Sequence, residues 1–149
     1  MDLIKFMGKL DDLSIVRRRI IRTIDTSPLN LSINKTQENV LMAILKTPRN
    51  NMTDLSVQVG IEKSSLTRVI DSLIEEGLVM RTHRLSDRRT INCVLTEKGM
   101  DVANRIDVIM REHLESKFSD LSEEEKDKLF THLSEAVEML FKSRLFKKS

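Results

Sequence analysis

The stretch KSSLTRVIDSLIEEGLVMRTHRLSDRRTINCVLTEKG, residues 63–99, decides the fold because the spacing of its apolar residues changes along it. In its first part apolar residues recur every three or four positions, which predicts a helix over residues 63–76 with one buried face. Gly77 then stands where a left-handed residue ends a helix. The runs 79–84 and 91–95 are short and contain β-branched residues, and the charged segment between them predicts a hairpin.

Two more helices are predicted upstream of this stretch. The first starts near residues 34–36, where Asn34 and Gln37 match a capping box. The second is short, with Thr53 as its predicted N-cap and Gly60 as its C-terminal stop. This short helix and the helix over 63–76 form a helix-turn-helix, to which the hairpin adds a two-stranded wing. The predicted fold class is mainly α, a winged helix-turn-helix.

The composition limits the classes of protein to which this chain can belong. With 149 residues, 40% of them hydrophobic and 32% charged, it suits one domain with an appended helical interface. Its longest apolar run, Val40–Leu45, is too short for a membrane span or a signal peptide, so we expect a cytoplasmic protein that binds no membrane. The single cysteine excludes an internal disulfide framework and any multi-cysteine metal site.

Positive charge is concentrated on the predicted hairpin, although the net charge of the chain is only +2. The adjacent Arg88 and Arg89 stand on a projecting tip, a position that suits arginines entering a narrow minor groove. Asp87 beside them is expected to cap the turn or to pair with an arginine, and so to hold the wing in shape. The alternative interpretation is a solvated, charged turn.

The helix over 63–76 presents small hydroxyl residues and two cations in its N-terminal half once its buried positions are set aside. A helix N-terminus favours anions such as phosphate, and small side chains let a helix approach base edges. A solvated helix face is the alternative. The predicted DNA-binding residues are Lys63, Ser64, Ser65, Thr67 and Arg68 on this helix, with Arg84, Arg88 and Arg89 on the wing.

Long amphipathic helices are predicted on both sides of the winged helix. The first runs from Asp2 to about Asp25 and is expected to end because of Pro28, and the last opens at the capping-box pair Ser122 and Glu125. Their apolar stripes exceed what one small core covers, which favours a homodimer over a helical subdomain in a monomer. The predicted interface residues are Leu3, Phe6, Leu10, Leu129, Leu133, Val137 and Leu140.

The hairpin and its flanks resemble a known family. Asp87-Arg88-Arg89, followed by Leu95-Thr96 and Gly99, reads D-x-R-x5-L-T-x-x-G, and Leu66-Thr67-Arg68 and Gly77-Leu78-Val79 precede it. On these residues the chain resembles the MarR family of bacterial winged-helix transcription regulators over essentially its whole length. The resemblance implies a homodimer that binds a pseudo-palindromic operator and is released by a small ligand. Arg89 occupies the position of the arginine in D-x-R.

These observations divide the chain into an N-terminal dimerisation helix (1–33), a winged helix-turn-helix DNA-binding domain (34–99) and C-terminal dimerisation helices (100–149). The predicted function is that of a sequence-specific regulator of transcription, expected to be a repressor, with no enzyme activity and no cofactor. Its predicted partners are double-stranded DNA and a second copy of the chain. The alternative is a winged-helix protein-interaction module whose basic wing faces an acidic partner.

A ligand is predicted to bind between the winged-helix lobe and the dimerising helices, because interfaces between domains favour concave sites. Ile20, Ile24 and Met42 are the candidate lining residues. The arginines of the first helix are compatible with a small anionic or aromatic ligand, although a solvated face or a salt-bridge network also explains them. These arginines are Arg17, Arg18, Arg19 and Arg22.

Cys93 and the histidines are assigned no chemical role. Cys93 lies in a strand-like run and is predicted to be a small buried hydrophobe rather than a redox sensor. His83, His113 and His132 lack the spacing of metal ligands, so no metal is expected. A catalytic triad, paired catalytic carboxylates and a phosphate-binding glycine loop are not recognisable in the sequence.

Overall fold

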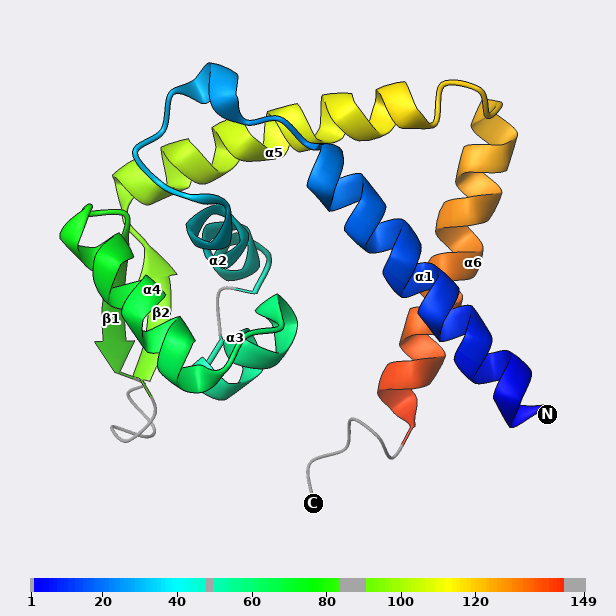
Figure 1. The fold of residues 1–149 in the computed structure, drawn as a ribbon, viewed down its shortest axis with the longest axis horizontal. Helices are drawn as coiled ribbons and strands as arrows, with labels where there is room; N and C mark the ends of the chain where they lie inside the picture. The colour runs from blue at the N-terminus through cyan, green and yellow to red at the C-terminus, as the bar shows by residue number, and fades with distance from the viewer. Residues whose placement is uncertain (1, 48–49, 84–90, 144–149) are drawn as a thin grey trace. The chain divides into compact units, whose positions relative to one another are not determined.

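The computed structural model describes residues 2–47, 50–83 and 91–143, and it confirms a mainly α winged helix-turn-helix (Figure 1). The chain divides into two compact units, residues 1–111 and 112–149. The elements are α1 (Leu3–Thr23), the 3-10 helix η1 (Ser27–Leu29), α2 (Lys35–Lys46), α3 (Met52–Val59), α4 (Lys63–Glu75), β1 (Val79–His83), β2 (Ile91–Leu95), α5 (Glu97–Lys117) and α6 (Glu123–Lys142).

The core of the first unit surrounds α2, which packs against α3, α4 and β2 (Figure 1). Five consecutive residues of this helix, from Val40 to Ile44, are buried. A helix that is apolar on several sides is covered on several sides, which accounts for the long apolar run in the sequence. The buried cluster that contains these residues of α2 also includes Leu55, Leu66, Ile70, Leu73, Val79, Cys93, Ala103 and Ile106.

The start of α3 corrects one prediction. Asn51, not Thr53, is the N-cap, because the Asn51 side chain accepts a hydrogen bond of 2.9 Å from the Asp54 backbone N–H. Thr53 is already the second residue of the helix. The C-terminal stop is confirmed, since Gly60 adopts the left-handed conformation with φ of 77°.

The end of α1 corrects another prediction. The helix ends at Thr23, and Pro28 does not end it but lies within η1. Ile24 is extended, with φ −74° and ψ 117°, and its side chain is buried. The chain therefore leaves the helix at Ile24, before the proline is reached. The capping box of Asn34 and Gln37 at the start of α2 is confirmed.

The corner between α4, the strands and α5 explains why glycines stand at residues 77 and 99. Gly77 has φ of 70°, and the Leu78 N–H donates to the Leu73 carbonyl at 2.9 Å, as in a left-handed helix terminus. The Thr96 hydroxyl donates to the Gly77 carbonyl at 2.7 Å and accepts from the Gly99 N–H at 3.0 Å. A Cβ at Gly99 would lie 1.9 Å from the Leu78 carbonyl oxygen, so only glycine fits there.

The hairpin is formed by β1 and β2, which pair antiparallel from Val79 opposite Leu95 to His83 opposite Ile91. The strand predicted for 79–84 is described up to His83, and the strand predicted for 91–95 is confirmed. The hairpin follows α4 directly, and the two are packed together. This arrangement brings the base of the wing beside the second helix of the helix-turn-helix (Figure 1).

The second unit contains the end of α5 and the whole of α6. The capping box at the start of α6 is confirmed, because the Ser122 side chain accepts from the Glu125 N–H and the Glu125 carboxylate accepts from the Ser122 N–H. In the described part of the chain, α6 has no buried residue. Within residues 2–47, 50–83 and 91–143, none of the helices has the length and apolar character needed to cross a membrane.

Candidate nucleic-acid interface and adjoining cavity

The α4 helix separates an apolar face from a polar one. Leu66, Ile70 and Leu73 are fully buried against the core, which fixes the rotation of the helix. On the other side Lys63, Ser64, Ser65 and Arg68 are exposed. Four of the five helix residues predicted to contact DNA therefore form one accessible polar surface.

Thr67 differs from the other four. It is half-buried, and its hydroxyl donates to the Lys63 carbonyl at 2.9 Å. The hydroxyl proton is therefore used inside the helix, and only the oxygen lone pairs remain for a partner. Sequence periodicity placed Thr67 toward solvent and gave no sign of this hydrogen bond.

The N-terminus of α4 has the features of an anion site. The N-cap residue is Glu62, whose side chain makes no capping hydrogen bond within the described residues. The N–H groups of the first helical turn are therefore not satisfied by a side-chain cap, and they point out of the N-terminal end of the helix.

An ion pair joins α4 to the base of the wing. Arg81 Nη2 on β1 lies 2.6 Å from Asp71 Oδ1 on α4, and both side chains are about half-exposed. The charge of Asp71 on the polar face of the helix is thus balanced from the neighbouring strand. Sequence reasoning missed this pair, because residues ten apart in a helix and a strand meet only through the tertiary fold.

The predicted wing-tip residues lie outside the described residues. These are Arg84, Asp87, Arg88 and Arg89. The structure describes the strands that carry them, and their roles remain predictions from the sequence.

Cys93 is buried, as predicted. Its Sγ lies 3.9 Å from the Met52 Sδ, and the residue is only 1% exposed. Burial raises the pKa of the Cys93 thiol, while the nearby Arg81 charge lowers it by less. The thiol is therefore held in its neutral, less nucleophilic form.

A cavity of about 280 Å³ lies beside the winged helix in the first unit. Ile24 and Met42 line it, whereas the predicted Ile20 does not. Of the first-helix arginines, Arg17 and Arg18 line it. The remaining lining residues are Ile21, Lys35, Glu38, Asn39, Ala43, Lys46, Gln58, Val59, Ile106 and Met110.

The charge of the cavity lining is strongly positive. Four cationic side chains, Arg17, Arg18, Lys35 and Lys46, face one carboxylate, Glu38. Apolar residues from α1, α2, α3 and α5 make up most of the rest. An apolar cavity with several cations at its wall suits a small organic anion.

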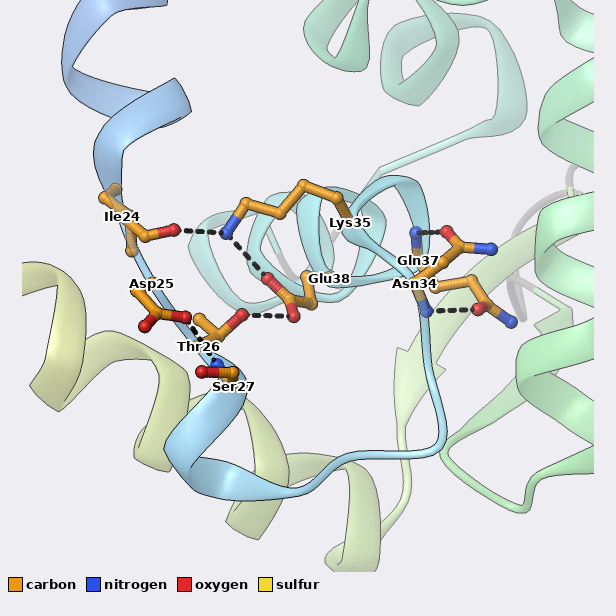
Figure 2. A network of polar contacts seen from close by, with 8 residues as sticks. All are labelled: Ile24, Asp25, Thr26, Ser27, Asn34, Lys35, Gln37 and Glu38. Carbon is orange, nitrogen blue, oxygen red and sulfur yellow. Dashed lines mark hydrogen bonds and ion pairs between the residues drawn. The ribbon is translucent and has the colours of Figure 1, made fainter.

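The carboxylate of Glu38 is held at the junction of α1 and α2 (Figure 2). One oxygen lies 2.9 Å from the Lys35 ammonium, and the other accepts from the Thr26 hydroxyl at 2.6 Å. Lys35 also donates to the Ile24 carbonyl at 3.3 Å. Beside this cluster the Asp25 carboxylate caps η1 through the Ser27 N–H at 2.9 Å, and hydrogen bonds from Ser27 lower the pKa of Asp25.

The residues predicted to form a dimer interface are accessible in this single chain. Leu3 is 65% exposed and Leu129 46%, and Leu133 and Val137 are exposed as well. Phe6, Leu10 and Leu140 are half-buried.

In the described part of the chain no group of three His, Cys, Asp or Glu side chains could hold a metal ion.

Helix-turn-helix, wing and flanking helices together define the winged-helix class. Residues 33–91 match the family model described as "MarR family". The HTH-type transcriptional regulator SarZ of Staphylococcus haemolyticus is 29% identical over 98 residues, which cover 66% of this chain and 65% of SarZ. The matched region thus spans less than two thirds of that relative. Over residues 33–91 the chain is therefore similar to the MarR family, and the fold agrees with that similarity.

Solved structures agree on the fold. The S. aureus MepR–DNA complex has a TM-score of 0.62 at 18% identity and covers 86% of this chain and 94% of its own. A structure of Bordetella bronchiseptica BpsR, which concerns regulation of its DNA binding by 6-hydroxynicotinic acid, has a TM-score of 0.62 at 20% identity. It covers 87% of this chain and 91% of its own. At these identities the likeness concerns the fold.

Proposed function

We propose that this chain is a sequence-specific DNA-binding regulator of transcription, acting as a homodimer. The observation that carries the proposal is the polar face of α4, where Lys63, Ser64, Ser65 and Arg68 are exposed beside the base of the wing. A helix of this kind fits the major groove, and a basic wing reaches the adjacent minor groove. The MepR structure, a fold relative, was solved with DNA.

The homodimer is supported by the exposed apolar residues of α1 and α6. Soluble proteins seldom leave such residues accessible along whole helices, because their burial is favourable. A two-fold pair places two recognition helices about one DNA turn apart, roughly 34 Å, and so selects a pseudo-palindromic operator. The regulator is proposed to be a repressor.

Release from DNA by a small ligand is the second part of the proposal. The cavity of about 280 Å³ adjoins α2 at the centre of the winged-helix core, and its lining is cationic and apolar. A ligand there can shift the protein between DNA-binding and non-binding shapes only if it binds one shape more tightly. The BpsR structure concerns the regulation of that protein's DNA binding by 6-hydroxynicotinic acid, a small aromatic acid.

The test is fluorescence anisotropy with labelled DNA from upstream of the protein's own gene, titrated at several salt concentrations. Binding should be sequence-dependent and should weaken with salt, because counterions are released from phosphates. Arg68→Ala should weaken it by about 1–3 kcal/mol, whereas Lys117→Ala, which removes an exposed charge at the end of α5, should not. Binding with no sequence preference, or equal effects of the two variants, refutes the proposal in favour of a protein-interaction module.

A further inference from the structure

The ion pair between Arg81 and Asp71 lies where the wing meets the second helix of the helix-turn-helix. Arg81 Nη2 on β1 lies 2.6 Å from Asp71 Oδ1 on α4, and β1 packs against α4 (Figure 1). The two side chains are 40% and 49% exposed, so the pair is open to solvent. An exposed ion pair contributes little to the free energy of folding, because water screens it. This pair is therefore better suited to meet a partner than to hold the fold together.

Asp71 stands on the proposed DNA-binding face of α4. Helical spacing aligns it in one row with Ser64, Arg68 and Glu75, which are all exposed. Alone, the two carboxylates of this row would outweigh its one cation and repel DNA phosphates. The cation that neutralises Asp71 comes from β1, and within the described residues Asp71 forms no ion pair with Arg68. Arg68 therefore remains available to DNA.

The Arg81 guanidinium is fixed at both ends of its side chain. Its backbone stands opposite the buried Cys93 in the β1–β2 ladder, so the sheet fixes where the side chain starts. The Asp71 carboxylate fixes where it ends. A guanidinium has five N–H donors, and within the described residues its hydrogen bond to Asp71 uses one of them. The exposed donors suit a second oxyanion, since arginine binds phosphate through two parallel N–H groups.

The place of this guanidinium corresponds to one part of B-DNA. A recognition helix lies in the major groove and a wing enters the adjacent minor groove. The sugar–phosphate backbone that separates these two grooves then crosses the junction of helix and wing. Arg81 and Asp71 join β1 to α4 at this junction. A phosphate of that backbone is thus the oxyanion that comes nearest to the exposed donors of Arg81.

We propose that Arg81 binds a phosphate of the DNA backbone that separates the two grooves, and that Asp71 is the positioning residue that aims its guanidinium. The inference rests on the proposed function, in which α4 and the wing bind DNA. It adds a contact outside both the helix residues and the wing-tip residues predicted from the sequence. A phosphate contact carries no base information, so its role is to set the register of helix and wing on the duplex.

The first test measures how operator binding depends on salt, by fluorescence anisotropy. Each phosphate contact adds about 0.9 to the slope of log affinity against log salt concentration. Arg81→Gln should weaken binding about tenfold and lower the slope by about two for a dimer, one for each subunit. Arg81→Lys, which keeps the charge, should keep most of the slope. Lys117→Gln, which removes an exposed cation at the end of α5, is the control and should change neither quantity.

The second test separates positioning from simple charge. Asp71→Asn and Glu75→Gln each remove one carboxylate from the same row of α4, and within the described residues Glu75 has no ion pair. Charge alone predicts that both changes strengthen DNA binding. We expect Asp71→Asn to weaken it about threefold or more, because Arg81 loses the group that aims it, and Glu75→Gln to leave it unchanged or stronger. In the Arg81→Gln background, Asp71→Asn should cause no further loss.

The third test locates the phosphate. A neutral methylphosphonate replaces one phosphate at a time along an operator half-site. At one position, on the backbone between the two grooves, the replacement should weaken wild-type binding about as much as Arg81→Gln does. The same replacement should have no effect on Arg81→Gln, because the contact is already lost. A purely structural role of Arg81 would not produce this pattern.

Three results overturn the assignment of Arg81. They are an unchanged salt slope in Arg81→Gln, Asp71→Asn binding as tightly as Glu75→Gln, and methylphosphonates that affect wild type and Arg81→Gln alike at every position. Circular dichroism shows that each variant is folded; if Arg81→Gln is not, the comparison of Asp71→Asn with Glu75→Gln decides. Absence of sequence-specific binding by the wild-type chain refutes the proposed regulator itself, whereas wild-type binding with any of the three results refutes only the role of Arg81.

Discussion

Helices α4 and α6 have similar apolar spacing, yet their apolar faces differ in burial. In α4 the residues Leu66, Ile70 and Leu73 are fully buried, whereas α6 has no buried residue in its described length and its Phe130 is 73% exposed. Periodicity states which face of a helix is apolar but not what covers it. The apolar face of α4 is covered within the winged helix, whereas that of α6 is not buried in the described part of the chain.

The largest expected effect comes from removing α6. A chain that ends before Ser122 should lose specific DNA binding, although it keeps every predicted base-contacting residue. The truncation deletes Leu129, Leu133, Val137 and Leu140, which are the predicted interface residues of α6, and each buried leucine contributes roughly 1.5–3 kcal/mol. Sedimentation and DNA-binding anisotropy measure the two properties together. A truncated chain that remains a dimer and binds its operator would show that α6 is not the interface.

Leu73→Ala should have the next largest effect, on folding rather than on assembly. Leu73 is fully buried in the cluster around α2, and truncating such a leucine costs about 2–5 kcal/mol of unfolding free energy. The loss should be independent of protein concentration, which chemical denaturation at two concentrations checks. A change below 1 kcal/mol would contradict the burial of α4 described here.

Leu133→Ala is the matching change in α6, where the side chain is 44% exposed in a single chain. Its expected effect is on the dimer: roughly 1.5–3 kcal/mol of association free energy, the usual contribution of one buried leucine. Unfolding of the monomer at low concentration should change little. Sedimentation equilibrium of wild type and variant gives both dimer dissociation constants, and equal constants would remove Leu133 from the interface.

The sequence predicted the elements well because their signals are local. Capping pairs such as Asn34 with Gln37, and glycines such as Gly77, depend on neighbours within one helical turn. The N-cap of α3 was misplaced because Asn51 and Thr53 are both good cap residues, and only the backbone decides between them. The structure alone shows the tertiary result, in which Ile24 leaves α1 to enter the core.

The candidate site was predictable from the sequence where its residues follow from helical spacing, and not where they meet through the tertiary fold. Exposed positions of α4 follow from helical spacing, so Lys63, Ser64, Ser65 and Arg68 were found. The Arg81–Asp71 pair and the Thr26–Glu38 hydrogen bond join separate elements, and no spacing rule indicates them. Among the residues expected to line a ligand site, Ile24 and Met42 line this cavity and Ile20 does not, a distinction that helical spacing alone does not make.

A smaller effect is expected at the wing, whose tip arginine Arg89 was predicted from the sequence. Arg89→Ala should leave folding and dimerisation intact and weaken DNA binding by roughly 1–3 kcal/mol, the usual contribution of one arginine contact. The comparison with Leu133→Ala separates contact from assembly, since only the leucine variant should change the dimer constant. Unchanged operator affinity in a folded Arg89→Ala dimer would exclude Arg89 from DNA binding.

The smallest expected effect is the pH dependence of the α6 N-terminus. Hydrogen bonds from the Ser122 backbone N–H, at 2.8 Å, and from its hydroxyl, at 3.0 Å, hold the pKa of Glu125 below its usual value. A carboxylate whose pKa is lower in the folded state stabilises that state at pH values above its unfolded pKa.

This contribution disappears as the pH falls through the lowered folded pKa. The first turn of α6 should therefore fray in acid, on the low side of the ordinary glutamate value of about 4.3. Glu125→Gln keeps the capping geometry and has no charge to lose, so its first turn should not show this transition. NMR titration of the Glu125 side-chain carboxyl measures its pKa in the folded protein. The amide signals of residues 123–126, followed in both proteins, report the fraying of the first turn. An ordinary glutamate pKa, or the same acid transition in the glutamine variant, would show that the capping box does not couple α6 to pH.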